Sequence, residues 1–173
     1  ATLAQLINSY SSYSAITKND WDLITKQFTI VWNQCWDSTE RLLYHAFSSQ
    51  QLDYWTSDPD IWDTAKTDKN KWTSMTAAGH SAAFWGRAEG WYFLALVDVL
   101  EEMQKANLTN SVNYSTLSNY LVQLAAGIKD RQDATTGCWY QLIAKNGSYS
   151  ASYYRGKTYS AKSNYLESSC TAL

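Results

Sequence analysis

Cysteine is scarce in this chain, with three residues at Cys35, Cys138 and Cys170. The number is odd and no two are spaced as CxxC, so the sequence predicts neither a disulfide scaffold nor a zinc site. We therefore expect no metal, and three free thiols placed in helices.

Charge of one sign and long apolar runs are also lacking. The formal net charge is −2, no basic tract occurs, and we expect no nucleic-acid or membrane partner. No stretch approaches the ~18 apolar residues of a membrane span. The first ten residues, ATLAQLINSY, lack the basic flank and apolar core of a signal peptide. Cytoplasmic, periplasmic and secreted locations all remain compatible with the sequence.

Aromatic residues, by contrast, are abundant: nine Trp and thirteen Tyr accompany one Pro and seven Gly. Such aromatics commonly line concave sites, where indoles stack on the apolar faces of sugar rings. A large aromatic core would account for the same composition, so both interpretations stay open.

Helical periodicity runs through most of the chain. Apolar residues recur every three or four positions, and Asn19 and Asp20 signal a helix start. The segment from Glu89 to Lys105 is apolar around most of its girth, which predicts a buried helix. Irregular polar segments at 48–83 and 144–164 read as functional loops. The expected helices cover residues 2–14, 20–36, 89–105, about 115–131, and a last one that starts in 168–173.

An internal sequence repeat divides the chain into two similar units. CWDSTERLLYHAF (35–47) and RQDATTGCWYQLI (131–143) align on Asp37 and Asp133, which look like turn and cap residues. Each unit is a helix, a turn with a short extended piece, a loop and a new helix start. Repeated helical hairpins of this kind predict an all-α toroid with its loops on one face.

The stretch FWGRAEGW (84–91) places Arg87 between Trp85 and Trp91 at a helix start. A guanidinium grips a carboxylate in a bidentate fork and indoles supply stacking surfaces, which suits an anionic sugar. A salt bridge between Arg87 and Glu89 at the helix start is the structural alternative.

Other polar candidates follow from the loops. His45 after Tyr44 could donate a hydrogen bond, carry a proton or bind a ligand, or be an ordinary surface residue. Glu167 heads the last helix, where the helix dipole stabilises a carboxylate, and a capping role is the alternative. For His80 the sequence identifies no partner.

Four blocks together resemble glycoside hydrolase family 105, the unsaturated rhamnogalacturonyl hydrolases. They are LLYHAF, FWGRAEGWYFLALVDVLEEM, DATTGCWYQ and NYLESSCTA, and the resemblance covers residues 3–173. It implies an (α/α)6-barrel-type toroid, of which this chain is a partial barrel of about five to six helices. Residues 1–173 are then one partial domain, paired with the rest of the barrel or with another chain.

The resemblance also implies a chemistry. An Asp protonates the double bond of a non-reducing-end unsaturated uronyl sugar, water adds to the vinyl ether, and the hemiketal collapses without any cofactor. By position, the substrate-binding residues are His45, Trp85, Arg87 and Trp91, with Tyr44 and Glu167 as weaker candidates. The general acid Asp is expected before residue 1, and Ser48 stands where the family has Asp after the histidine.

Two functions remain open at this point. The chain is part of a glycosidase that degrades pectin or rhamnogalacturonan oligosaccharides, or a non-catalytic domain that binds acidic oligosaccharides or serves as a helical interaction module. Whether this chain alone is an enzyme depends on the missing Asp.

Overall fold

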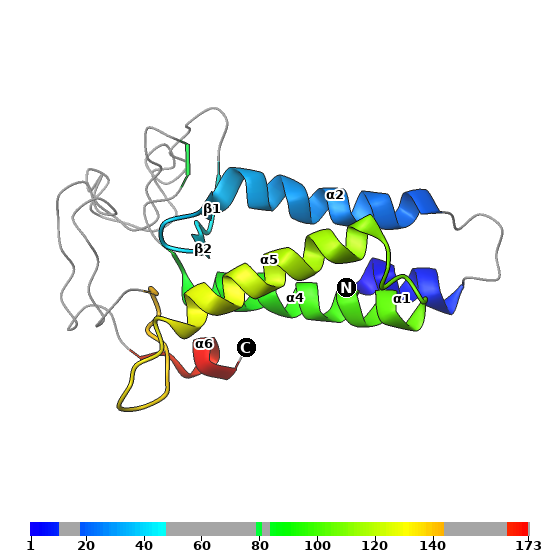
Figure 1. Ribbon diagram of the computed structural model, residues 1–173. Coiled ribbons are helices and arrows are strands. Elements are labelled where there is room, and N and C mark those ends of the chain that lie inside the picture. Colours follow the sequence, from blue (N-terminus) through cyan, green and yellow to red (C-terminus); the bar gives the residue numbers. More distant parts are fainter. Residues whose placement is uncertain (11–17, 48–78, 81–83, 144–165, 173) are drawn as a thin grey trace, which may run out of the picture.

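The computed structural model describes residues 1–10, 18–47, 79–80, 84–143 and 166–172, and these are mostly helical (Figure 1). The segments 48–83 and 144–164 lie almost wholly outside the described residues. The elements are α1 (Thr2–Ser9), α2 (Lys18–Cys35), β1 (Trp36–Asp37), β2 (Leu42–Leu43), α4 (Gly86–Lys105), α5 (Val112–Lys129) and α6 (Ser168–Ala172).

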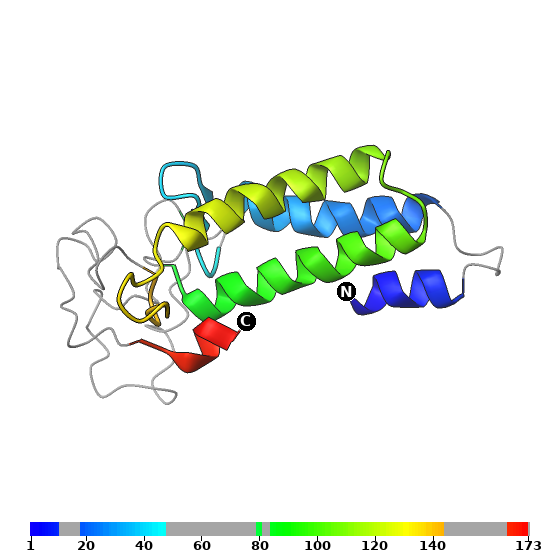
Figure 2. The same ribbon diagram turned by 60° about the horizontal axis from the view of Figure 1, so that its bottom comes forward.

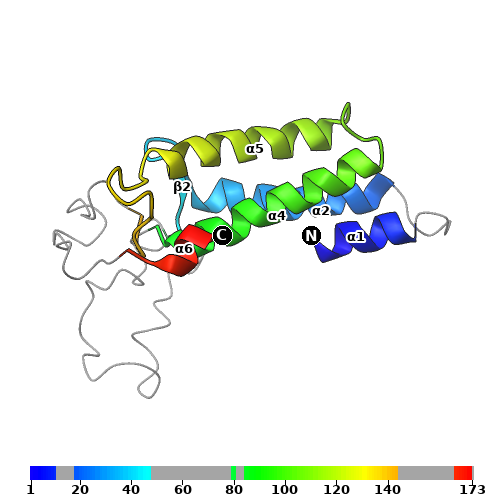
Figure 3. The same cartoon turned by 90° about the horizontal axis from the view of Figure 1, so that it is seen from below.

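The helices form two layers. Helices α1, α4 and α6 lie in one layer and α2 and α5 in the other (Figure 2). Within the layers α4 packs against α1 and α6, and α2 packs against α5; between them α4 packs against α5. The C-terminal ends of α2 and α5 and the N-terminal ends of α4 and α6 meet at the same end (Figures 1 and 3). The described turns that follow α2 and α5 therefore lie at the same end, as the repeat predicted, whereas residues 106–111, between α4 and α5, lie at the opposite end (Figure 1).

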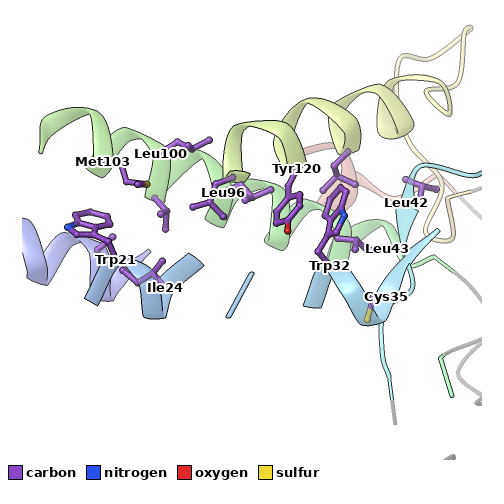
Figure 4. Close-up of a cluster of buried hydrophobic side chains, with 14 of the residues drawn as sticks. Trp21, Ile24, Trp32, Cys35, Leu42, Leu43, Leu96, Leu100, Met103 and Tyr120 are labelled. Carbon is purple, nitrogen blue, oxygen red and sulfur yellow. The ribbon is translucent and has the colours of Figure 1, made fainter. Parts of the chain in front are cut away.

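A continuous apolar core lies between the two layers (Figure 4). Trp32 of α2 stacks on Trp36, with ring centroids 3.9 Å apart, and on Tyr120 of α5 at 4.2 Å. Leu96 of α4 and Leu117 of α5 are fully buried. Each such side chain contributes about 1.5–3 kcal/mol on leaving water, so packing of the amphipathic helices holds the layers together.

The helix boundaries differ from the predicted ones by a few residues. α1 ends at Ser9, not residue 14, and α2 begins at Lys18, before the predicted Asn19 and Asp20 signal. α5 begins at Val112 because the Ser111 hydroxyl accepts the Tyr114 N–H at 3.1 Å. This is an ordinary serine N-cap.

α4 begins at Gly86, three residues before the predicted start, without a side-chain cap. Its first N–H instead donates to the carbonyl of Gln141 at 2.8 Å. Because Gln141 is 55 positions away in the sequence, the residues around Gly86 could not show that the helix begins there.

The two aligned turns have the same geometry. Asp37 Oδ1 accepts the N–H groups of Thr39 and Glu40, both at 2.9 Å, and Asp133 Oδ1 accepts that of Thr136 at 2.8 Å. The fifth residue of each turn is left-handed: Arg41 has φ 56° and Gly137 has φ 71°. The prediction that both aspartates are turn residues is confirmed.

The pieces after the turns are extended. β1 and β2 pair antiparallel, and single antiparallel bridges join Trp85 to Leu142 and Tyr140 to Leu166. Residues 140–142 therefore touch the starts of both α4 and α6. This short extended piece holds the two helix starts beside one another.

The cysteines agree in part with the prediction. Cys35 ends α2 as a buried free thiol, whereas Cys138 is a free thiol in the turn after α5. The helical placement expected for Cys138 is wrong, because α5 ends at Lys129 and Cys138 follows the Asp133 turn. None of the described helices is long and apolar enough to cross a membrane.

Candidate functional site

Arg87 lies in the first turn of α4 and contacts two of the predicted site residues. Its guanidinium carbon is 4.7 Å from the centroid of the Trp85 ring, a cation–π distance. Its Nη2 lies 3.1 Å from Glu167 Oε1, just before α6. The alternative salt bridge from Arg87 to Glu89 is therefore wrong: the partner of Arg87 is Glu167, 80 positions later in the sequence.

Arg87 retains donors for a further acceptor. Glu167 engages only Nη2, and the buried Nε has no hydrogen-bond partner among the described residues. The Arg87 side chain is 38% exposed, while that of Glu167 is 11% exposed. A buried N–H without an acceptor costs about 1–3 kcal/mol, so this guanidinium is suited to an incoming oxygen ligand.

Trp91 lies one helical turn after Arg87 and is 58% exposed. Residues four apart share a helix face, so its indole lies on the Arg87 side of α4. Within the described part of the chain it makes no ring contact with Trp85 or His45. The prediction that this helix is buried all round is wrong at Trp91, because the helix faces covered by α1, α5 and α6 do not include it.

His45 lies in a bend two residues after β2. Its ring meets that of Trp85 edge to face, with centroids 6.4 Å apart and planes at 85°. The structure therefore brings Trp85, Arg87 and His45 together at the loop end of the helices. Glu167 joins them through Arg87, and Trp91 lies at the border.

Tyr44 is held in place by its surroundings. Its hydroxyl donates to Asp37 Oδ2 at 2.8 Å, and its ring stacks on His80 at 3.7 Å and on Phe84 at 4.5 Å. Burial, then the hydrogen bond to Asp37, raise the pKa of its hydroxyl above the ordinary value. Tyr44 thus supports the site, and it supplies the His80 partner that the sequence did not identify.

Glu89 is the group near the site whose environment the sequence did not predict. It is 1% exposed, and its Oε1 accepts the N–H of Leu43 at 2.8 Å. Burial raises the pKa of this carboxyl well above its usual value, while the Leu43 hydrogen bond and the charge of Arg131 act in the opposite direction. Because its pKa is raised, the Glu89 carboxyl keeps its proton to a higher pH than an ordinary glutamate does.

A pocket of about 380 Å³ opens between the end of α2, the exit of β2 and the first turns of α4. Its polar lining includes Tyr44, His45 and Glu89, and its apolar lining includes Ile30, Val31 and Phe47. The exposure of these three apolar side chains, between 38% and 47%, leaves the mouth of the pocket accessible.

A second, more apolar pocket of about 340 Å³ lies between α4 and α5. Phe93, Ile128 and Trp139 line it, together with the backbone side of Gly86 and Gly90. None of the six predicted site residues contributes to it. Across the described residues, no group of three or more His, Cys, Asp or Glu side chains is placed to hold a metal ion.

The described helices thus form two layers, and an arginine lies among aromatic side chains at the end where the two aspartate turns lie (Figures 1 and 2). Residues 61–173 match the family model described as Glycosyl Hydrolase Family 88. The chain belongs to this family of glycoside hydrolases.

A solved structure supports the same assignment. The chain is similar to a glycoside hydrolase of family 105 from C. acetobutylicum ATCC 824, with 27% sequence identity and a TM-score of 0.67. The match covers 98% of this chain and 36% of that one. The resemblance to family 105 over part of a domain is confirmed, and the fold is an all-α partial barrel of the (α/α)6 type.

Proposed function

We propose that this chain forms the substrate-binding wall of a glycoside hydrolase that removes a non-reducing-end unsaturated uronyl sugar from pectin or rhamnogalacturonan oligosaccharides. Arg87 binds the uronate carboxylate, Trp85 and Trp91 border the planar ring, and His45 hydrogen-bonds to the sugar. Residues 1–173 act as one partial domain.

The observation that best supports this proposal is the position of the Arg87 guanidinium and its hydrogen-bond donor that the described residues leave unused. A cation that lies over an indole at 4.7 Å and keeps a buried Nε–H without a described acceptor fits a carboxylate better than a neutral group. The exposed Trp91 one turn on offers a second aromatic face at the same helix start.

The reaction needs a proton on the alkene carbon and a water on the neighbouring ring carbon. The acid protonates the double bond, water adds to the oxocarbenium carbon and returns one proton, and the hemiketal opens with release of the next sugar. In this proposal the acid is an Asp that precedes residue 1. The residues of this chain bind and orient the ring.

A second candidate is a domain that binds acidic oligosaccharides without cleaving them. It is favoured by the two carboxyl groups nearest the site, since Glu167 is paired with Arg87 and Glu89 with the backbone of Leu43. Each of these two carboxyl groups therefore has a structural partner in the fold.

Calorimetric titration with an unsaturated galacturonyl-rhamnose disaccharide tests the proposal. Arg87→Ala should weaken binding at least about tenfold, the loss of a charge-assisted hydrogen-bonded pair of about 1.5–3 kcal/mol. Lys105→Ala is the matched control. Like Arg87, Lys105 is a basic residue of α4 that pairs with a glutamate, but its partner is Glu102 and it lies at the opposite end of the helix. Unchanged binding in Arg87→Ala, with a large loss of thermal stability, would make Arg87 structural.

A further inference from the structure

Glu89 connects two parts of the site that are far apart in the sequence. Its carboxyl group is buried, and Oε1 accepts the Leu43 N–H at 2.8 Å across 46 positions. Leu43 itself is 5% exposed. A buried amide of this kind would lack a partner if the carboxyl oxygen were withdrawn, at a cost of about 1–3 kcal/mol.

The bond from the Leu43 N–H to Glu89 takes the place of a hydrogen bond to a neighbouring strand on the open side of β2. β1 and β2 form a ribbon of two strands in which Trp36 faces Leu43, and the next amide, that of Tyr44, donates to the Cys35 carbonyl at 2.8 Å. Successive N–H groups of a strand point to opposite sides. The Leu43 N–H therefore points away from β1, and Glu89 supplies the acceptor on that side.

Both residues of this hydrogen bond, Leu43 and Glu89, are close in sequence to candidate site residues. Leu43 is followed by Tyr44 and His45, whereas Glu89 lies two positions after Arg87 in the first turn of α4. The His45 ring and the Trp85 ring, one from each part, are 6.4 Å apart. A change in the Glu89 to Leu43 distance would therefore change how His45 lies relative to Arg87.

We propose that Glu89 is a positioning residue: its hydrogen bond to Leu43 fixes the segment that carries His45 against the helix start that carries Arg87. The inference rests on the proposed function only for the statement that both residues contact the sugar. Glu89 acts through the backbone of Leu43.

The hydrogen bond needs an acceptor oxygen at the end of a side chain of this length, and it needs no charge. A protonated carboxyl group keeps its carbonyl oxygen as an acceptor. Oε2 has no hydrogen-bond partner among the described residues. Glutamine should therefore replace glutamate at this position, while aspartate, one methylene shorter, should not reach Leu43.

Hydrogen exchange and histidine NMR on the 173-residue chain test this inference. The sequence has two histidines, so two side-chain signals report on the site. In Glu89→Asp we expect the Leu43 amide to exchange at least about tenfold faster, the loss of one hydrogen bond, and the His45 signal to shift. In Glu89→Gln both should match the wild type.

The control is Glu102→Gln, a buried acid of α4 that contacts Asn8 and Lys105 at the other end of the helix; it should leave Leu43 and His45 unchanged. Wild-type Leu43 exchange and an unshifted His45 signal in Glu89→Asp would overturn the inference. Equal loss in Glu89→Gln and Glu89→Asp would also overturn it.

Titration with the unsaturated disaccharide separates this inference from the proposed function. Glu89→Asp should bind more weakly than Glu89→Gln, by about tenfold if the His45 contact is lost. If the wild type binds no disaccharide, the proposed function fails, and the Leu43 and His45 signals alone decide for or against the positioning role. Equal disaccharide binding by both variants would contradict that role.

Discussion

The guanidinium of Arg87 and the carboxylate of Glu167 lie 3.1 Å apart and join the first turn of α4 to the residue that precedes α6. These are the two helix starts that follow the repeated turn units. The contact therefore links the two units at the loop end, and it occupies one nitrogen of the cation proposed to bind the substrate.

Glu167→Gln should tighten binding of the unsaturated disaccharide by up to about fivefold. Removal of a competing carboxylate makes Arg87 more available, and a partly exposed ion pair is worth only ~0.2–1 kcal/mol. The melting temperature should change little for the same reason. Calorimetric titration beside thermal unfolding measures both; weaker binding would instead show that Glu167 orients Arg87.

Gly127→Ala should destabilise the fold by about 3 kcal/mol, the upper range for forced overpacking. A Cβ atom at this position of α5 would lie 1.8 Å from the carbonyl oxygen of Arg41, so the first repeated turn would have to move. Denaturant unfolding measures the change. Gly137→Ala is the control: a Cβ there would meet only Gln132 Nε2, at the ordinary contact distance of 3.8 Å, but φ is 71°, and the change should cost about 1 kcal/mol. Equal losses in both variants would contradict the close packing at Gly127.

The stability of the chain should depend on pH through Glu89. Because burial raises the folded-state pKa above 4.5, the folded state holds this proton more tightly than the unfolded state. The stabilising contribution is complete below about pH 4.5 and is lost as the pH rises through the folded-state pKa. Denaturant unfolding over this range should show a decline that Glu89→Gln lacks. Parallel curves for the two proteins would show that Glu89 is ionised in the fold.

Ser111→Ala should lower the free energy of unfolding by about 1 kcal/mol, a typical loss for a helix cap. The Ser111 hydroxyl accepts the Tyr114 N–H at the start of α5. Ser115→Ala, at an exposed position in the same helix, should be nearly neutral. A loss at Ser115 as large as that at Ser111 would argue against the cap.

Local signals in the sequence were sufficient for the helices and the repeated turns. Apolar residues such as Leu96 and Leu100 of α4 recur at helical spacing and are buried in the core. Asp37 and Asp133 bind the backbone two or three residues onward, which is a local interaction. Periodicity and turn chemistry therefore predicted the element order and the end of the helices at which the two aspartate turns lie.

Contacts between distant positions could not be read from the same signals. The start of α4 depends on Gln141, the partner of Arg87 is Glu167, and Glu89 binds Leu43. Helical periodicity also cannot tell which face is covered, so it did not predict the exposed Trp91. The sequence thus predicted aromatic and polar side chains at the start of α4 and after β2, whereas it did not predict which of them pair.

The ultraviolet absorbance of the alkene in an unsaturated galacturonyl-rhamnose disaccharide tests the central claim most directly. It should be followed with this 173-residue chain and with any longer natural protein that contains it, each beside its Arg87→Ala variant. We predict that the band decays with the longer protein, persists with its Arg87→Ala variant, and persists with the 173 residues alone. Decay at the same rate with and without Arg87, or no decay with the longer protein, would contradict the account.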